Sequence, residues 1–147
     1  MKKTVLIVSI FLLLASVCSY AQDQQKDMLD LAAKLESCEV YTQKFIHPFT
    51  GESLERKIEG LVDGKCLYIE EMPNGGKMEC RYSVESRKAV AQYYRNIANA
   101  QSSGTKVELS LGDEKQEAKY TYTINGKEVE NPLQECLDNG TCTISGY

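Results

Sequence analysis

An apolar segment near the start of the chain most constrains what the rest can fold into. Val5 to Val17 is nearly free of polar residues, follows two lysines, and is followed by Ser19-Tyr20-Ala21. A short basic region, an apolar run of this length and small residues at the cleavage positions are typical of a secretory signal peptide. The run is also too short for a membrane-spanning helix. We therefore expect residues 1–21 to be removed, leaving residues 22–147.

The mature chain has the size and charge of a single acidic domain. Removing 21 of the 147 residues leaves 126, which is enough for one domain with its own core. Two lysines leave with the signal peptide, so 15 basic residues remain against 21 acidic ones, a net charge of −6. An acidic surface repels phosphate backbones and anionic lipids. We therefore expect neither nucleic acid as a partner nor a membrane span after signal cleavage.

Five cysteines remain in the mature chain, and export exposes them to an oxidising compartment where thiols pair. The odd number indicates two disulfides and one free thiol. Cys66 and Cys80 flank a turn, and Cys38 and Cys142 lie near the two ends of the domain. We expect the pairs Cys66–Cys80 and Cys38–Cys142, with Cys136 as a buried free thiol. Four cysteines allow three connectivities, so the other two stay open.

The first half of the mature chain predicts a helix followed by an antiparallel meander. Apolar residues at helical spacing indicate a helix over residues 24–36. Alternating polar and apolar residues then indicate strands joined by short turns. These strands cover residues 39–46, 53–62, 65–72 and 77–82.

The second half predicts a long helix, a hairpin and a short helix. Ser83 is a good N-cap for a helix over residues 84–100. Strands over 106–111 and 118–124 follow, and Asn125-Gly126 is a strong hairpin turn. Asn131, Pro132 and Gln134 mark the start of a last helix. The expected fold is α+β, with a single antiparallel sheet of about six strands and helices packed on one face.

Few residues suggest chemistry. His47 is the only histidine, so it could serve as a general base or a metal ligand, but it lies in a turn that contains proline and glycine. The cysteine spacings contain no C-x-x-C, which argues against a zinc ribbon or a thioredoxin-like site. We predict no catalytic residue, no metal and no cofactor. Metal handling through His47, Met72, Met78 and a free thiol is a weaker alternative.

Two tyrosines are candidates for a contact surface. Tyr120 and Tyr122 lie on the same face of one predicted strand. If that face is exposed to solvent, they would suit an interface, since tyrosine is enriched there. Their alternation with polar residues favours a place in the core instead.

These patterns predict a small exported protein of the periplasm or the exterior. Its turns, caps and core positions are well specified, whereas catalytic motifs are missing from the sequence. We therefore expect a non-catalytic module that binds a protein, a peptide or a component of the cell envelope. The alternative is a small extracytoplasmic hydrolase or thiol enzyme in which His47 works with a cysteine or a carboxylate.

Overall fold

A computed structural model describes residues 23–47, 49–102, 107–111 and 120–146 of the chain. For residues 101–102, 107–111 and 120–122 only the backbone is described. The predicted signal peptide, residues 1–21, lies outside the described residues, so its cleavage stays a prediction.

The main sheet is antiparallel and contains the predicted meander, which is confirmed. Its strand order is β1-β2-β3-β4-β8. Four of these strands follow one another along the chain, and the C-terminal tail supplies the fifth, which pairs with β4. The strands are β1 (Tyr41–Ile46), β2 (Ser53–Val62), β3 (Lys65–Glu71), β4 (Lys77–Tyr82) and β8 (Cys142–Ser145), with the 3-10 turn η1 (Pro73–Gly75) between β3 and β4.

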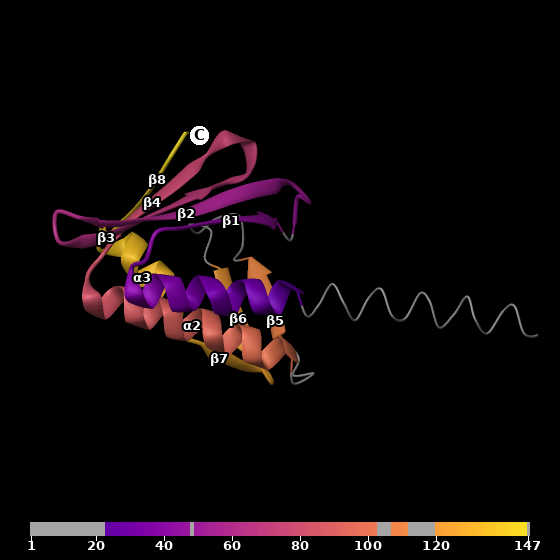
Figure 1. Ribbon diagram of the computed structural model, residues 1–147. Helices are drawn as coiled ribbons and strands as arrows, with labels where there is room; N and C mark the ends of the chain where they lie inside the picture. Colours follow the sequence, from indigo (N-terminus) through magenta and orange to yellow (C-terminus); the bar gives the residue numbers. More distant parts are fainter. Residues whose placement is uncertain (1–22, 48, 103–106, 112–119, 147) are drawn as a thin grey trace, which may run out of the picture.

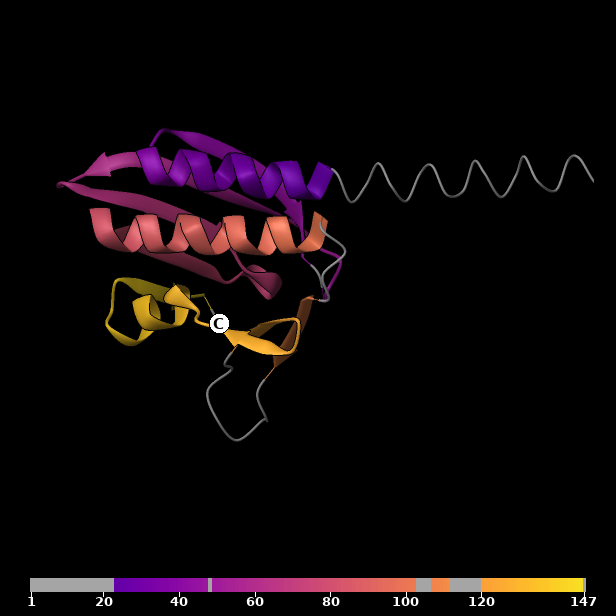
Figure 2. The ribbon, with the colours of Figure 1, turned by 90° about the horizontal axis from the view of Figure 1, so that it is seen from below.

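Helices cover one face of this sheet, as expected for an α+β fold. The first helix (residues 23–37) and α2 (Val84–Ser102) lie side by side against the sheet (Figures 1 and 2). Ser83 caps α2, because its hydroxyl oxygen accepts the Ser86 backbone N–H. Asn131 caps α3 (Pro132–Asp138) in the same way through the Leu133 N–H, whereas the Gln134 side chain donates to Asp138 instead of completing a capping box.

The second hairpin does not join the main sheet. Strands β5 (Val107–Leu111), β6 (Tyr120–Ile124) and β7 (Lys127–Val129) form a separate three-stranded antiparallel sheet. The prediction that this hairpin belongs to a single sheet is therefore wrong. The free side of β4 is instead occupied by β8, which the Cys80–Cys142 disulfide holds in register opposite β4.

The core lies between the main sheet and the helices. Leu31 and Leu35 from the first helix and Val90 from α2 pack there in one cluster with Ile58 and Tyr68 of the sheet, and each of these side chains is at most 1% exposed. Burial of apolar side chains such as these is the main favourable term in folding. The helix-facing side of the sheet is therefore closed, and the opposite face is open to solvent.

Two disulfides fasten this core, and the predicted pairings are wrong. Cys38, just after the first helix, is bonded to Cys66 on β3, and Cys80 on β4 is bonded to Cys142 on β8. Cys66 and Cys80 do share one face of their hairpin, but Cys66 lies opposite Tyr82 and Cys80 lies opposite Tyr68. The two cysteines are thus diagonal neighbours, and each has a closer partner from outside the hairpin. Cys136 on α3 is a free thiol and is buried.

Candidate functional site

The main sheet splits open at one end. The ladder between β2 and β3 ends at the pair Arg56↔Glu70, although β2 starts three residues earlier and β3 continues to Glu71. Beyond this pair β2 stays bonded to β1, and β3 stays bonded to β4. The two halves of the sheet therefore part, and a groove of about 730 Å³ opens between them.

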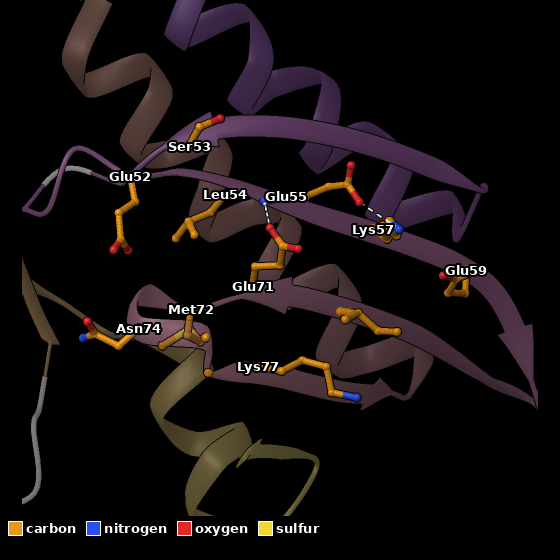
Figure 3. A pocket seen from close by; sticks show the side chains of 13 residues that line it. Glu52, Ser53, Leu54, Glu55, Lys57, Glu59, Glu71, Met72, Asn74 and Lys77 are labelled. Atoms are coloured by element: carbon orange, nitrogen blue, oxygen red, sulfur yellow. Dashed lines mark hydrogen bonds and ion pairs between the residues drawn. The ribbon is translucent and has the colours of Figure 1, made fainter. Parts of the chain in front are cut away.

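Nearly half of the residues that line the groove are charged. Four glutamates and two lysines contribute to its walls, so the lining carries an excess of negative charge (Figure 3). Both lysines are already paired, because Lys77 Nζ lies 3.4 Å from Glu79 Oε2 and Lys57 Nζ lies 2.8 Å from Glu55 Oε1. This hydrogen bond and the charge of Glu55 raise the pKa of Lys57. The lining residues are Glu52, Ser53, Leu54, Glu55, Lys57, Glu59, Ile69, Glu71, Met72, Asn74, Gly75, Gly76 and Lys77.

A side chain bridges the split where a backbone ladder would otherwise continue. The backbone N–H of Glu55 donates to Glu71 Oε2 at 2.7 Å, and Figure 3 shows the Glu71 side chain reaching across the groove to it. A buried or half-buried peptide N–H is costly to leave without an acceptor. At this position the Glu71 carboxylate therefore accepts the hydrogen bond that a backbone carbonyl of a neighbouring strand would accept.

A polar cluster lies directly behind the groove, on the helix-facing side of the last ladder pair. Arg56 Nε donates to Gln43 Oε1 at 2.8 Å, and the guanidinium carbon lies 4.6 Å from the centre of the Phe45 ring. The Tyr68 hydroxyl donates to Glu70. Burial alone would lower the pKa of Arg56, but the facing Tyr68 and Glu70 raise it, so the guanidinium stays charged. These contacts hold the end of the β2–β3 ladder in place.

The turn between β1 and β2 borders one end of the groove and contains His47. The His47 N–H donates to the carbonyl of Glu52, which lines the groove, at 2.8 Å. The turn also exposes two large apolar side chains, Ile46 at 49% and Phe49 at 51%. Ile46 lies opposite Ser53, which lines the groove, in the β1–β2 ladder, and opposite residues point to the same face. Ile46 therefore lies on the same face of the sheet as the acidic groove.

The imidazole of His47 is used to stabilise its own turn. Its Nδ1 atom accepts the Thr50 backbone N–H at 3.3 Å and lies 3.1 Å from the Thr50 hydroxyl. An imidazole that acts as a general base in a triad has the reverse arrangement, with a carboxylate accepting Nδ1–H and Nε2 free to take a proton. The Glu52 carboxylate in the same turn accepts from the Thr50 hydroxyl at 3.4 Å.

Cys136 does not lie near this turn in any contact that the structure records. It is 3% exposed in the core cluster, and burial, together with the neighbouring Glu135 charge, raises the pKa of its thiol. A thiol with a raised pKa is a poor nucleophile at neutral pH. None of the described contacts of His47 joins it to Cys136, its partner in the alternative thiol-enzyme hypothesis.

Met78 is buried in the core on β4, whereas Met72 lines the groove. Over the described ranges, no three His, Cys, Asp or Glu side chains gather in a way that could hold a metal ion. Tyr120 and Tyr122 lie on β6, and their side chains lie outside the described part of the structure, so their role as a contact surface stays a prediction.

The groove was not predicted from the sequence. The only signals were Arg56, which interrupts the apolar side of β2, and the glutamates on both sides of the β3–β4 turn. Neither reveals that the ladder ends early.

No helix in the described part of the chain is both long and apolar enough to cross a membrane. In comparisons with known proteins, no family model, no curated protein and no solved structure matches this chain.

Proposed function

We propose that this protein is a small exported module that binds another protein or peptide and catalyses no reaction itself. The observation that carries the proposal is the acidic groove at the split of the main sheet, next to the exposed Ile46 and Phe49. Binding sites combine a hollow with a few polar groups and accessible apolar side chains. Two disulfides and the predicted signal peptide support a place in the periplasm or outside the cell.

The partner is tested by photo-crosslinking in the host. A benzophenone side chain replaces Phe49, at the border of the groove, and a matched variant carries it at Val84, which is exposed at the start of α2. We expect a discrete protein adduct from position 49 and none from position 84. Adducts at neither position, or equal adducts at both, would contradict the proposed binding surface.

Export is tested by mass measurement of the protein purified from its host. We expect a chain that begins at Gln22 and contains two disulfides. Alkylation after unfolding without reductant then modifies one thiol, that of Cys136. A chain that still begins at Met1 with its cysteines reduced would show that the protein stays in the cytoplasm.

A further inference from the structure

The split in the main sheet leaves part of β2 without a neighbouring strand on one side. Within β2, Ser53, Leu54 and Glu55 precede the last pair with β3. The Glu55 N–H points toward the groove, because its acceptor Glu71 comes from the β3 side. Peptide groups two residues apart in a strand point the same way, so those of Ser53 also face the groove. This stretch is an internal strand edge that is open to a ligand.

The Glu71 carboxylate marks the place of a missing acceptor. It receives the Glu55 N–H at 2.7 Å, as the carbonyl of an adjacent antiparallel strand would. Glu71 is an exposed residue and its side chain can rotate away into solvent. A peptide carbonyl that took its position would keep the Glu55 N–H satisfied.

The charge of the groove selects the side chains of such a peptide. The lining has four glutamates and two lysines; Lys57 is paired with Glu55, and Lys77 is paired with Glu79, which lies outside the lining. Basic side chains on an incoming segment would be attracted to the remaining carboxylates, and acidic ones would be repelled. The volume of about 730 Å³ lies within the range of small-ligand sites, which suits a short segment rather than a folded domain.

Resting on the proposed binding function, we infer that the groove takes a short extended peptide with basic side chains. The peptide adds to β2 as a strand along Ser53–Glu55 and displaces the Glu71 carboxylate from the Glu55 N–H. Recognition of this kind obtains affinity from main-chain hydrogen bonds and specificity from alternate side chains.

The test uses three synthetic hexapeptides with the intact mature protein in a calorimetric titration. The first alternates Lys and Val, and the second alternates Glu and Val. The third is the Lys–Val peptide with its lysine backbone nitrogens methylated, so that these nitrogens cannot donate hydrogen bonds to β2. We expect binding of the first, weakened by salt, with at least about tenfold weaker binding of the other two. Equal binding of the Lys and Glu peptides would overturn the charge selection, and equal binding of the methylated peptide would overturn strand addition.

Two variants of Glu71 test the displacement. Glu71→Gln and Glu71→Ala remove the same charge, but only glutamine keeps an oxygen that can accept the Glu55 N–H. We expect the alanine variant to bind the Lys–Val peptide about threefold to tenfold more tightly than the glutamine variant, since no side chain then competes for that N–H. Glu130→Ala, at an exposed glutamate outside the groove lining, is the matched control and should bind as the native protein does. Equal affinities of the two Glu71 variants would overturn the displacement.

The outcomes separate this inference from the proposed function. If none of the peptides binds while crosslinking from position 49 still yields a discrete partner, strand addition is wrong and the binding function stands. If peptides bind in the groove but no adduct forms in the host, the groove chemistry is right and the proposed cellular role is wrong.

Discussion

At the scale of single residues, the site depends on how charged side chains are distributed over the two faces of β2. Arg56 points toward the helices, where Gln43 and the Phe45 ring contact it, and Glu70 lies opposite in the ladder. Glu55 and Lys57 point to the other face and line the groove. Arg56, whose side chain is packed against its neighbours, therefore lies in the last pair of the β2–β3 ladder. The buried contacts of Arg56 fix that end, and the groove begins directly beyond it.

Replacing Arg56 tests this role. Arg56→Ala removes the hydrogen bond to Gln43 and leaves Glu70 without its facing cation, so we expect the free energy of unfolding to fall by about 2 kcal/mol. Arg81→Ala is the control, because Arg81 forms an ion pair with Glu79 at 3.1 Å on the open face and should change stability by less than about 0.5 kcal/mol. Urea unfolding followed by circular dichroism measures both. Equal losses for the two variants would show that the cluster does not support the ladder.

At the scale of elements, local signals predicted the helices and strands closely. Asp63-Gly64 gives the β2–β3 turn with both residues in the left-handed region, and Asn125-Gly126 does the same between β6 and β7. Capping residues set the starts of α2 and α3. Each of these turns and caps depends on a few neighbouring residues, so they can be predicted from the sequence alone.

Pairing over long distances was not predictable in the same way. The last residues of the chain look like an extended tail, and only their disulfide from Cys142 to Cys80 and their ladder with β4 make them a strand of the main sheet. The disulfide partners, the separate second sheet and the end of the β2–β3 ladder all depend on which elements meet in space. The groove forms because the β2–β3 ladder ends early, and no motif in the sequence corresponds to it.

The Cys38–Cys66 disulfide joins the end of the first helix to β3, which gives a prediction at this scale. The double variant Cys38→Ala/Cys66→Ala loses a link across 28 residues and leaves no new free thiol. We expect the free energy of unfolding to fall by about 3 kcal/mol, because the unfolded chain gains conformational freedom. Urea unfolding measures the loss, and peptide mapping verifies that Cys80 stays bonded to Cys142. Unchanged stability, or a native peptide that links Cys66 to Cys80, would contradict the connectivity.

At the scale of the whole molecule, buried tyrosines make the fold sensitive to alkaline pH. Burial raises the pKa of Tyr68 and Tyr82 well above the ordinary value of 10.0. Above that value the unfolded chain loses these protons while the folded protein keeps them. The unfolded state then binds fewer protons, so stability falls as the pH rises beyond about 10.

The alkaline loss of stability can be assigned to one of these residues. We expect the urea midpoint of the native protein to fall between about pH 9 and pH 11, because the unfolded state deprotonates first. In Tyr82→Phe one buried phenol is missing, so the decline should be shallower. The same slope for the native protein and the variant would mean that Tyr82 titrates normally in the folded state.

The whole molecule thus has a helix-covered face held by two disulfides and an open face that carries the split. The closed face supplies stability, and in the proposed function the open edge of β2 recognises the ligand. The amide of Glu55 reports on this arrangement directly, since its N–H donates to Glu71 in the free protein.

Nuclear magnetic resonance of the mature protein with the Lys–Val hexapeptide tests the central claim most directly. We predict that the amide signals of Ser53 and Glu55 shift on titration, that the Glu55 amide stays protected from exchange, and that cross-strand contacts appear between β2 and the peptide. Unchanged signals at Ser53 and Glu55, with shifts confined to other surfaces or missing altogether, would contradict the account.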